Sequence, residues 1–130
     1  MHATEVFGRY AEQYQQQTLP PEVIHHAKRA VIDWYASLLP GLASAPLAQL
    51  ERVLADDLDR GRAKLGNGRA ATARAAALFN GTAAHAAEID DSFRDAMYHP
   101  GAATIAAALA ASQDAGPDGL CFLRPLVLGY

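Results

Sequence analysis

The sequence TARAAALFNGTAAHAAEIDD, residues 72–91, is the most informative about the architecture because it is long, rich in alanine and free of proline. It predicts a helix that starts at Thr72, is punctuated at Asn80-Gly81 and continues through the acidic residues at its end. Alanine supplies 18 of the residues between 70 and 111. Small side chains at that density let helix axes approach closely, so we expect a central helix surrounded by others.

Helical signals also flank this stretch on both sides. Apolar spacing, caps and prolines predict helices over residues 4–17 with a Thr4 cap, from Pro21 to about Leu39, from a Ser44 cap to Leu58, and over 102–114 up to Gly116. A last apolar segment starts at Pro117, and Pro125 lies inside it. Residues 61–69, GRAKLGNGR, predict a turn with at most one short extended piece.

No pair of strands with a convincing alternation is evident, so the expected fold is all-α. The expectation is a multi-helix bundle around a central alanine-rich helix. At 130 residues the chain has the size of one domain, and we assign residues 1–130 to a single helical domain.

The charge pattern excludes several classes of partner. Eleven Lys and Arg stand against fourteen Asp and Glu, without a basic patch, which argues against nucleic-acid binding. The single cysteine, Cys121, cannot form an internal disulfide, and no stretch has the apolar length of a membrane span. We therefore expect a soluble cytoplasmic protein with no membrane partner.

Polar chemistry is concentrated in HAAEIDDSFRDAMYHPG, residues 85–101. On a continuing helix, His85, Glu88 and Ser92 fall within roughly 60° of one another and share a face. Residues 92–100 are expected to form a loop that delivers His99 to the start of the next helix, where free N–H groups can hold a carboxylate. The pattern therefore places a base beside an anion site.

Each of these residues also has a plain structural interpretation. His85 beside alanines is compatible with an ordinary helix histidine, and the acids at 88, 90 and 91 with a solvated helix end. His85 and Glu88 are three residues apart, but in the reverse order of a di-iron Glu-x-x-His pair and without a second copy, so we expect no metal. The chain has no nucleophile elbow, Walker loop or dinucleotide fingerprint, and no cofactor is expected.

Four segments together carry a resemblance: LPPEVIHHAKRAVIDWYASLLPG at 19–41, AALFNGTAAHAAEIDDSF at 76–93, HPGAATIAAALAAS at 99–112 and LVLGY at 126–130. Their order and spacing resemble the MmgE/PrpD family. The resemblance implies an all-helical main domain, joined in full-length members to a smaller α+β lid domain. It also implies metal-independent chemistry on small polycarboxylates, with 2-methylcitrate dehydratase, cis-aconitate decarboxylase and iminodisuccinate epimerase among the activities.

The resemblance assigns roles residue by residue. The family's His-x-x-Asp-φ-Asp-Asp-Thr run falls on residues 85–92, with Glu88 in place of the usual Asp and Ser92 in place of Thr, and its His-Pro-Gly falls on residues 99–101. His99 is the expected acid–base catalyst, and Glu88 would orient it or take the partner proton. Ser92, Asp91 and His85 would contact the substrate, and Asp91 would also fix the loop. The identity of the polycarboxylate stays open.

Full-length members of the family are several times longer, so the resemblance implies that this chain is an amino-terminal piece. Helix faces that later helices would cover are then exposed, which favours a homo-oligomer or association with a complementary subunit. Two functions follow as alternatives: part of a polycarboxylate lyase or isomerase, or a catalytically silent helical module that only associates. The catalytic alternative requires His99 and Glu88 to face a common cavity.

Overall fold

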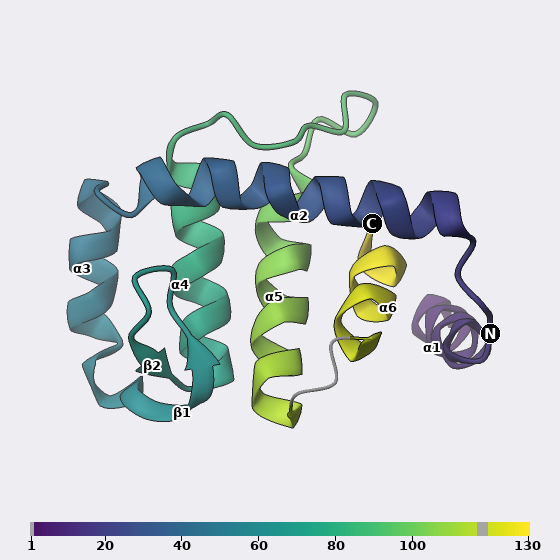
Figure 1. The fold of residues 1–130 in the computed structure, drawn as a ribbon, viewed down its shortest axis with the longest axis horizontal. Helices are drawn as coiled ribbons and strands as arrows, with labels where there is room; N and C mark the ends of the chain where they lie inside the picture. The colour runs from purple at the N-terminus through teal and green to yellow at the C-terminus, as the bar shows by residue number, and fades with distance from the viewer. Residues whose placement is uncertain (1, 117–119) are drawn as a thin grey trace.

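The computed structural model describes residues 2–116 and 120–130, which form a mostly helical fold (Figure 1). The helices are α1 (Ala3–Gln15), α2 (Pro21–Gly41), α3 (Ala45–Val53), α4 (Ala73–Ala86), α5 (Pro100–Ala115) and α6 (Leu120–Gly129). A 3₁₀ turn, Ala55–Asp57, leads into an antiparallel pair of strands, β1 (Leu58–Lys64) and β2 (Ala70–Ala71). The expected helical class is confirmed. Pro117, the expected start of the last segment, lies outside the described residues.

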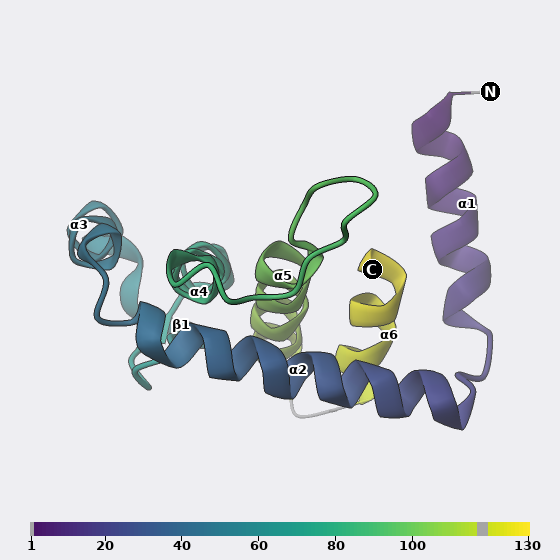
Figure 2. The ribbon, with the colours of Figure 1, turned by 90° about the horizontal axis from the view of Figure 1, so that it is seen from above.

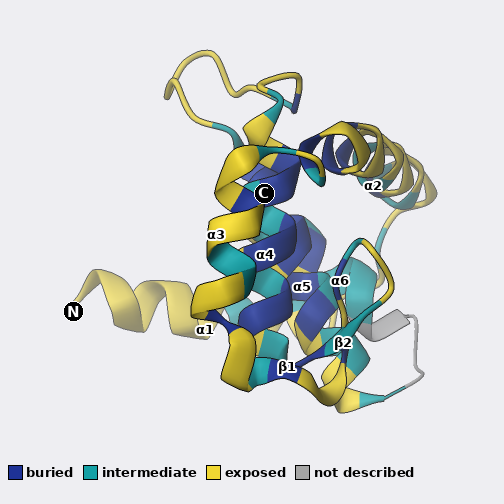
Figure 3. Ribbon diagram, turned by 90° about the vertical axis from the view of Figure 1, so that its left-hand side faces the viewer, coloured by how far each residue is buried: buried dark blue, intermediate teal, exposed yellow. Residues whose placement is uncertain are grey.

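Helices α3, α4, α5 and α6 stand side by side, and α2 runs across one end of this row (Figures 1 and 2). α4 and α5 occupy its centre and contain more buried residues than the other helices do (Figure 3). Trp34 and Leu38 of α2 close the core, with exposed fractions of 2% and 1%. The expected central alanine-rich helix is therefore confirmed as α4, with α5 as an equally buried neighbour.

Small side chains allow α4 and α5 to pack closely. A Cβ atom added to Gly81 of α4 would lie 2.9 Å from the carbonyl oxygen of Ala102 on α5. Ala83 and Ile105, one on each helix, are fully buried. Because the backbones approach this closely, a larger residue at position 81 would force the helices apart.

Asn80 does not punctuate α4, contrary to the sequence expectation, because the helix runs unbroken through it. The side chain is 3% exposed. Its Oδ1 accepts a hydrogen bond from Gly66 N at 2.7 Å, and its Nδ2 donates to the Lys64 carbonyl at 2.9 Å. The buried amide therefore satisfies backbone groups of the β1–β2 connection and fixes that connection to the central helix.

The third helix ends at Val53, so its predicted extension to Leu58 is wrong. Leu58 instead starts β1, pairs with Ala71 and is 5% exposed. The strand pair was not expected because a register shift between Leu58 and Ala63 breaks the period-two alternation that marks a strand. Within this bulge, Asp59 adopts a left-handed backbone with φ 58°.

The helix ends agree only in part with the predicted caps. α1 begins at Ala3 with His2 as its N-cap, so Thr4 is not the cap, whereas the Thr72 hydroxyl accepts a hydrogen bond from Ala75 N and caps α4 as expected. Gly116 ends α5 with a φ of 133°, also as expected. In residues 2–116 and 120–130, no helix combines the length and apolar character needed to cross a bilayer.

Candidate active site

The polar motif begins where α4 ends, at Ala86. Glu88 then adopts a left-handed backbone with φ 50°, and its N–H donates to the His85 carbonyl at 3.0 Å. This reversal ends the helix and turns the chain back toward His85. The expected helix through the acidic residues is therefore wrong, and His85, Glu88 and Ser92 do not share a helix face.

The reversal places the carboxylate of Asp90 between two imidazole rings. Its side chain is only 1% exposed. His85 Nδ1, from the last turn of α4, lies 3.1 Å and 3.3 Å from its two oxygens, and His99 Nδ1, just before α5, lies 3.4 Å from Oδ1. A buried carboxylate is stable only beside hydrogen-bond donors or cations, and the two rings supply them.

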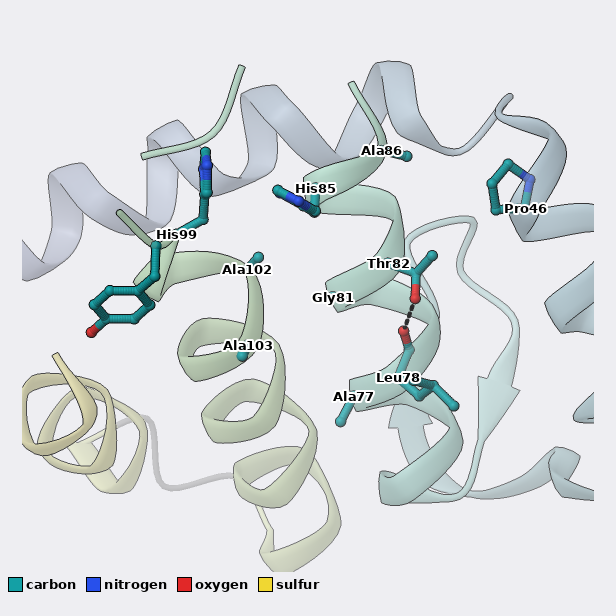
Figure 4. A pocket seen from close by; sticks show the side chains of 11 residues that line it. Pro46, Ala77, Leu78, Gly81, Thr82, His85, Ala86, His99, Ala102 and Ala103 are labelled. Carbon is teal, nitrogen blue, oxygen red and sulfur yellow. Dashed lines mark hydrogen bonds between the residues drawn. The ribbon is translucent and has the colours of Figure 1, made fainter. Parts of the chain in front are cut away.

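The rings of His85 and His99 also contact each other. Their centroids are 4.7 Å apart, with an edge-to-face angle of 61°. Figure 4 shows both rings at the same end of the gap between α4 and α5. Two residues 14 positions apart in the sequence thus form one imidazole pair at the mouth of that gap.

His99 Nδ1 is buried and has no hydrogen-bond partner among the described residues. Its separation from Asp90 is within ion-pair reach, but the angle does not make a hydrogen bond. Catalytic hydrogen bonds are often long or poorly aligned before substrate binds and tighten in the complex. A small rotation of the His99 ring would complete the contact.

A pocket of about 830 Å³ opens below the two imidazoles, between α4 and α5 (Figure 4). It is lined by Pro46, Ala77, Leu78, Gly81, Thr82, His85, Ala86, Tyr98, His99, Ala102 and Ala103. The Thr82 hydroxyl donates to the Leu78 carbonyl at 2.8 Å. Among the described residues that line the pocket, none is Arg or Lys, so the walls supply proton-transfer groups but no fixed positive charge.

Asp91 fixes the loop to α5, the structural part of its expected role. Its Oδ1 accepts a hydrogen bond from Gly101 N at 3.0 Å, and its Oδ2 accepts one from the Tyr130 hydroxyl at 2.9 Å. Burial raises the pKa of Tyr130, and the hydrogen bond to Asp91 raises it further. Because the chain's own carboxylate takes this N–H, the predicted anion site at the start of α5 is already partly filled.

Of the five predicted site residues, the structure brings together His85 and His99 but not Glu88, Asp91 or Ser92. Glu88 and Ser92 are exposed and do not line the pocket described above, so His99 and Glu88 do not face this cavity together. Asp90 holds the place beside His99 that was expected for Glu88. The sequence feature that could have indicated Asp90 is its position just after an alanine-rich helix. If that helix ends before the acidic residues, one of them can turn inward.

Among the described residues, His85, Asp90 and His99 also form a group whose ligand atoms could hold a cation. One ligand atom each from His85, Asp90 and His99 lies within 4.8 Å of the others. Two imidazoles and a carboxylate are a common ligand set for divalent transition metals. His85 Nδ1 already contacts both oxygens of Asp90, so a cation would have to displace the proton that they share.

Comparison with known proteins matches the chain to a protein family. The family model described as MmgE/PrpD N-terminal domain matches residues 5–130, a range that includes every residue of the candidate site. The search of curated proteins and the search of solved structures returned no match.

Proposed function

Because the chain belongs to the MmgE/PrpD family, as its N-terminal domain, we propose that it forms the histidine-bearing wall of a lyase active site. The reaction is the dehydration of 2-methylcitrate or a similar small polycarboxylate by metal-independent proton transfer. Decarboxylation or epimerisation of a related acid needs the same proton transfer next to a carboxylate. We place the protein in the cytoplasm.

One observation supports this proposal above the others: His99 lines the pocket directly before α5 while its Nδ1 faces Asp90. The other ring nitrogen, Nε2, lies on the opposite side of the imidazole. An imidazole whose one nitrogen faces a carboxylate is a suitable acid–base group near neutral pH through the other. We therefore assign His99 the removal of a proton from the carbon beside a substrate carboxylate.

The exposed loop residues have supporting roles in the proposal. Glu88 and Ser92 lie outside the pocket lining, so the proposal gives Glu88 no proton transfer, and Ser92 would contact a substrate carboxylate or hydroxyl that extends out of the pocket. Both lie on the connection between α4 and α5 that also carries Asp90 and Asp91. Asp91 holds this connection against Gly101, so a substrate would meet it in a fixed position.

The test compares His99→Gln with His26→Gln, a change of an exposed histidine on α2 away from the pocket. Each protein is assayed alone and mixed with the separately expressed remainder of a full-length family member. The substrates are 2-methylcitrate, cis-aconitate and iminodisuccinate, followed by alkene absorbance, carbon dioxide release and optical rotation. We expect His99→Gln to lower turnover by about 10²-fold or more and His26→Gln to leave it unchanged. Equal rates for the two variants would refute the role of His99.

The absence of Arg and Lys from the described pocket lining favours a second candidate, a silent helical module that associates with a partner. Exposed apolar side chains agree with it, among them Phe7 at 72%, Ile32 at 70% and Leu39 at 60%. In the enzyme proposal, a second copy or a complementary subunit supplies the cations. Turnover only on mixing supports the enzyme, and association without turnover supports the module.

A further inference from the structure

We propose that His85 is a second catalytic residue and that His85 and His99 act as an acid–base pair joined by the carboxylate of Asp90. This inference rests on the proposed dehydration. In the pair, His99 removes the proton from carbon, and His85 protonates the hydroxyl that leaves from the neighbouring carbon.

The two rings face the same carboxylate and the same pocket, and of the two only His85 is hydrogen-bonded to Asp90. Both present Nδ1 to the same carboxylate, at 3.1 Å for His85 and 3.4 Å for His99, and both line the same pocket. In each ring Nε2 lies across from Nδ1 and therefore away from Asp90. With centroids 4.7 Å apart, the rings can reach groups on adjacent carbons of one small substrate.

The charge balance suits one protonated and one neutral ring. The Asp90 carboxylate can carry one negative charge, and its side chain is almost completely buried, with 1% exposed. One carboxylate neutralises one imidazolium, whereas two imidazolium rings in contact would repel each other.

The proposed step balances in atoms and charge. The C–H bond beside a substrate carboxylate breaks, and its proton goes to Nε2 of neutral His99. The electron pair forms the C=C bond, the C–O bond on the adjacent carbon breaks, and the departing oxygen takes the proton from Nε2 of protonated His85. Water and an unsaturated acid leave, and the two rings return to their starting states by exchanging protons with solvent.

Other groups at the pocket compete poorly for the acid role. The Thr82 hydroxyl is already hydrogen-bonded to the Leu78 carbonyl. Tyr98 lines the pocket and carries the other hydroxyl there, but a phenol is a weaker acid near neutral pH than an imidazolium. Tyr98→Phe therefore tests the competing proton donor of the same pocket.

The test replaces the leaving group. Wild type, His85→Gln, His99→Gln and Tyr98→Phe are assayed, under the mixing conditions given above, with 2-methylcitrate and with its analogue in which chloride replaces the leaving hydroxyl. Chloride departs without a proton, so the acid is not needed. We expect His85→Gln to lose about 10²-fold or more with the hydroxyl substrate and only a few-fold with chloride. His99→Gln should lose activity with both substrates, and any loss in Tyr98→Phe should be the same with both.

The outcomes separate this inference from the proposal beneath it. A wild type without turnover refutes the dehydration itself and the pair with it. If the wild type is active and His85→Gln loses turnover equally with both substrates, His85 has a structural role. If His85→Gln loses turnover with neither substrate, His85 takes no part in the reaction. Either result overturns the pair. The pair would also be overturned if Tyr98→Phe, and not His85→Gln, lost turnover with the hydroxyl substrate and kept it with the chloride analogue.

A second measurement does not depend on turnover. Nitrogen-15 chemical shifts report which ring nitrogen of each histidine carries a proton. We expect Asp90→Asn to change the shifts of both His85 and His99, and Asp56→Asn, a change of an exposed acid in the 3₁₀ turn, to change neither. If Asp90→Asn alters only one ring, the two histidines are not a coupled pair and the proposal fails.

Discussion

Gly101→Ala perturbs the site through a single methyl group. A Cβ atom at this position would lie 2.5 Å from Asp91 Oδ1 and 2.6 Å from the Tyr130 hydroxyl. The carboxylate would have to retreat by about 0.9 Å to reach the 3.4 Å of an ordinary contact. That retreat lengthens the 3.0 Å hydrogen bond from Gly101 N and loosens the contact to Tyr130.

The expected cost follows from those contacts. A hydrogen bond to a charged group contributes about 1.5–3 kcal/mol, and replacing glycine by alanine within a helix returns up to about 1 kcal/mol. We expect the free energy of unfolding to fall by about 1–2 kcal/mol. His99 lies two residues earlier, and a displacement of about 1 Å at a catalytic group can lower turnover by about 10²-fold.

The assay is urea unfolding followed by circular dichroism, with Gly8→Ala as the matched control. Gly8 lies within α1, and an added Cβ would have nothing within 4 Å. Because α1 has no buried residue, the same substitution there should not lower the free energy of unfolding, and any gain should be at most about 1 kcal/mol. If Gly101→Ala is as stable as Gly8→Ala, Asp91 does not hold the start of α5 in the way described here.

Three further predictions test other parts of the structure. Asn80→Ala should lower the free energy of unfolding by about 1–3 kcal/mol, measured in urea, because Gly66 N and the Lys64 carbonyl lose their partner; a neutral result contradicts the anchoring role. Because the pKa of Tyr130 is raised above its ordinary 10.0, the protonated hydroxyl stabilises the fold, and stability should fall as pH rises beyond about 10; Tyr130→Phe should flatten that fall in unfolding curves measured against pH. Dialysis against a chelator should leave turnover unchanged, and its loss with recovery on adding Zn²⁺ would show that His85, Asp90 and His99 hold a required metal.

The presence of the helices could be predicted from the sequence, because alanine content and apolar spacing favour a helix through residues that are close together in the chain. The central helix could be predicted from Thr72, whose hydroxyl caps it, and the end of α5 from Gly116. The strand pair could not be predicted, because the bulge between Leu58 and Ala63 removes the alternating pattern. Asn80 looked like a helix breaker, although its role depends on backbone groups 14 and 16 positions away.

The candidate site was predictable as a region, but its pairing was not. The motif places two histidines and several acids within 17 residues, and His85 and His99 do meet. Which acid joins them depends on where α4 stops, and one left-handed residue, Glu88, decides that. Helix periodicity gives no warning of such a residue, because glutamate is a good helix former. The helix therefore had to be seen to end before Asp90 could replace Glu88 as the partner.

Helix α1 has few contacts with the rest of the molecule, and this affects which part of the chain unfolds first. None of the residues of this helix is buried against the part of the chain that the structure describes, and it stands apart from the row formed by α3 to α6 (Figure 2). Arg124 holds its end by donating to the carbonyl of Gln15 at 3.0 Å. Segments with so few buried apolar contacts unfold locally at low free energy. Amide hydrogens in α1 should therefore exchange with solvent long before those of α4, which makes this arm a separate cooperative unit.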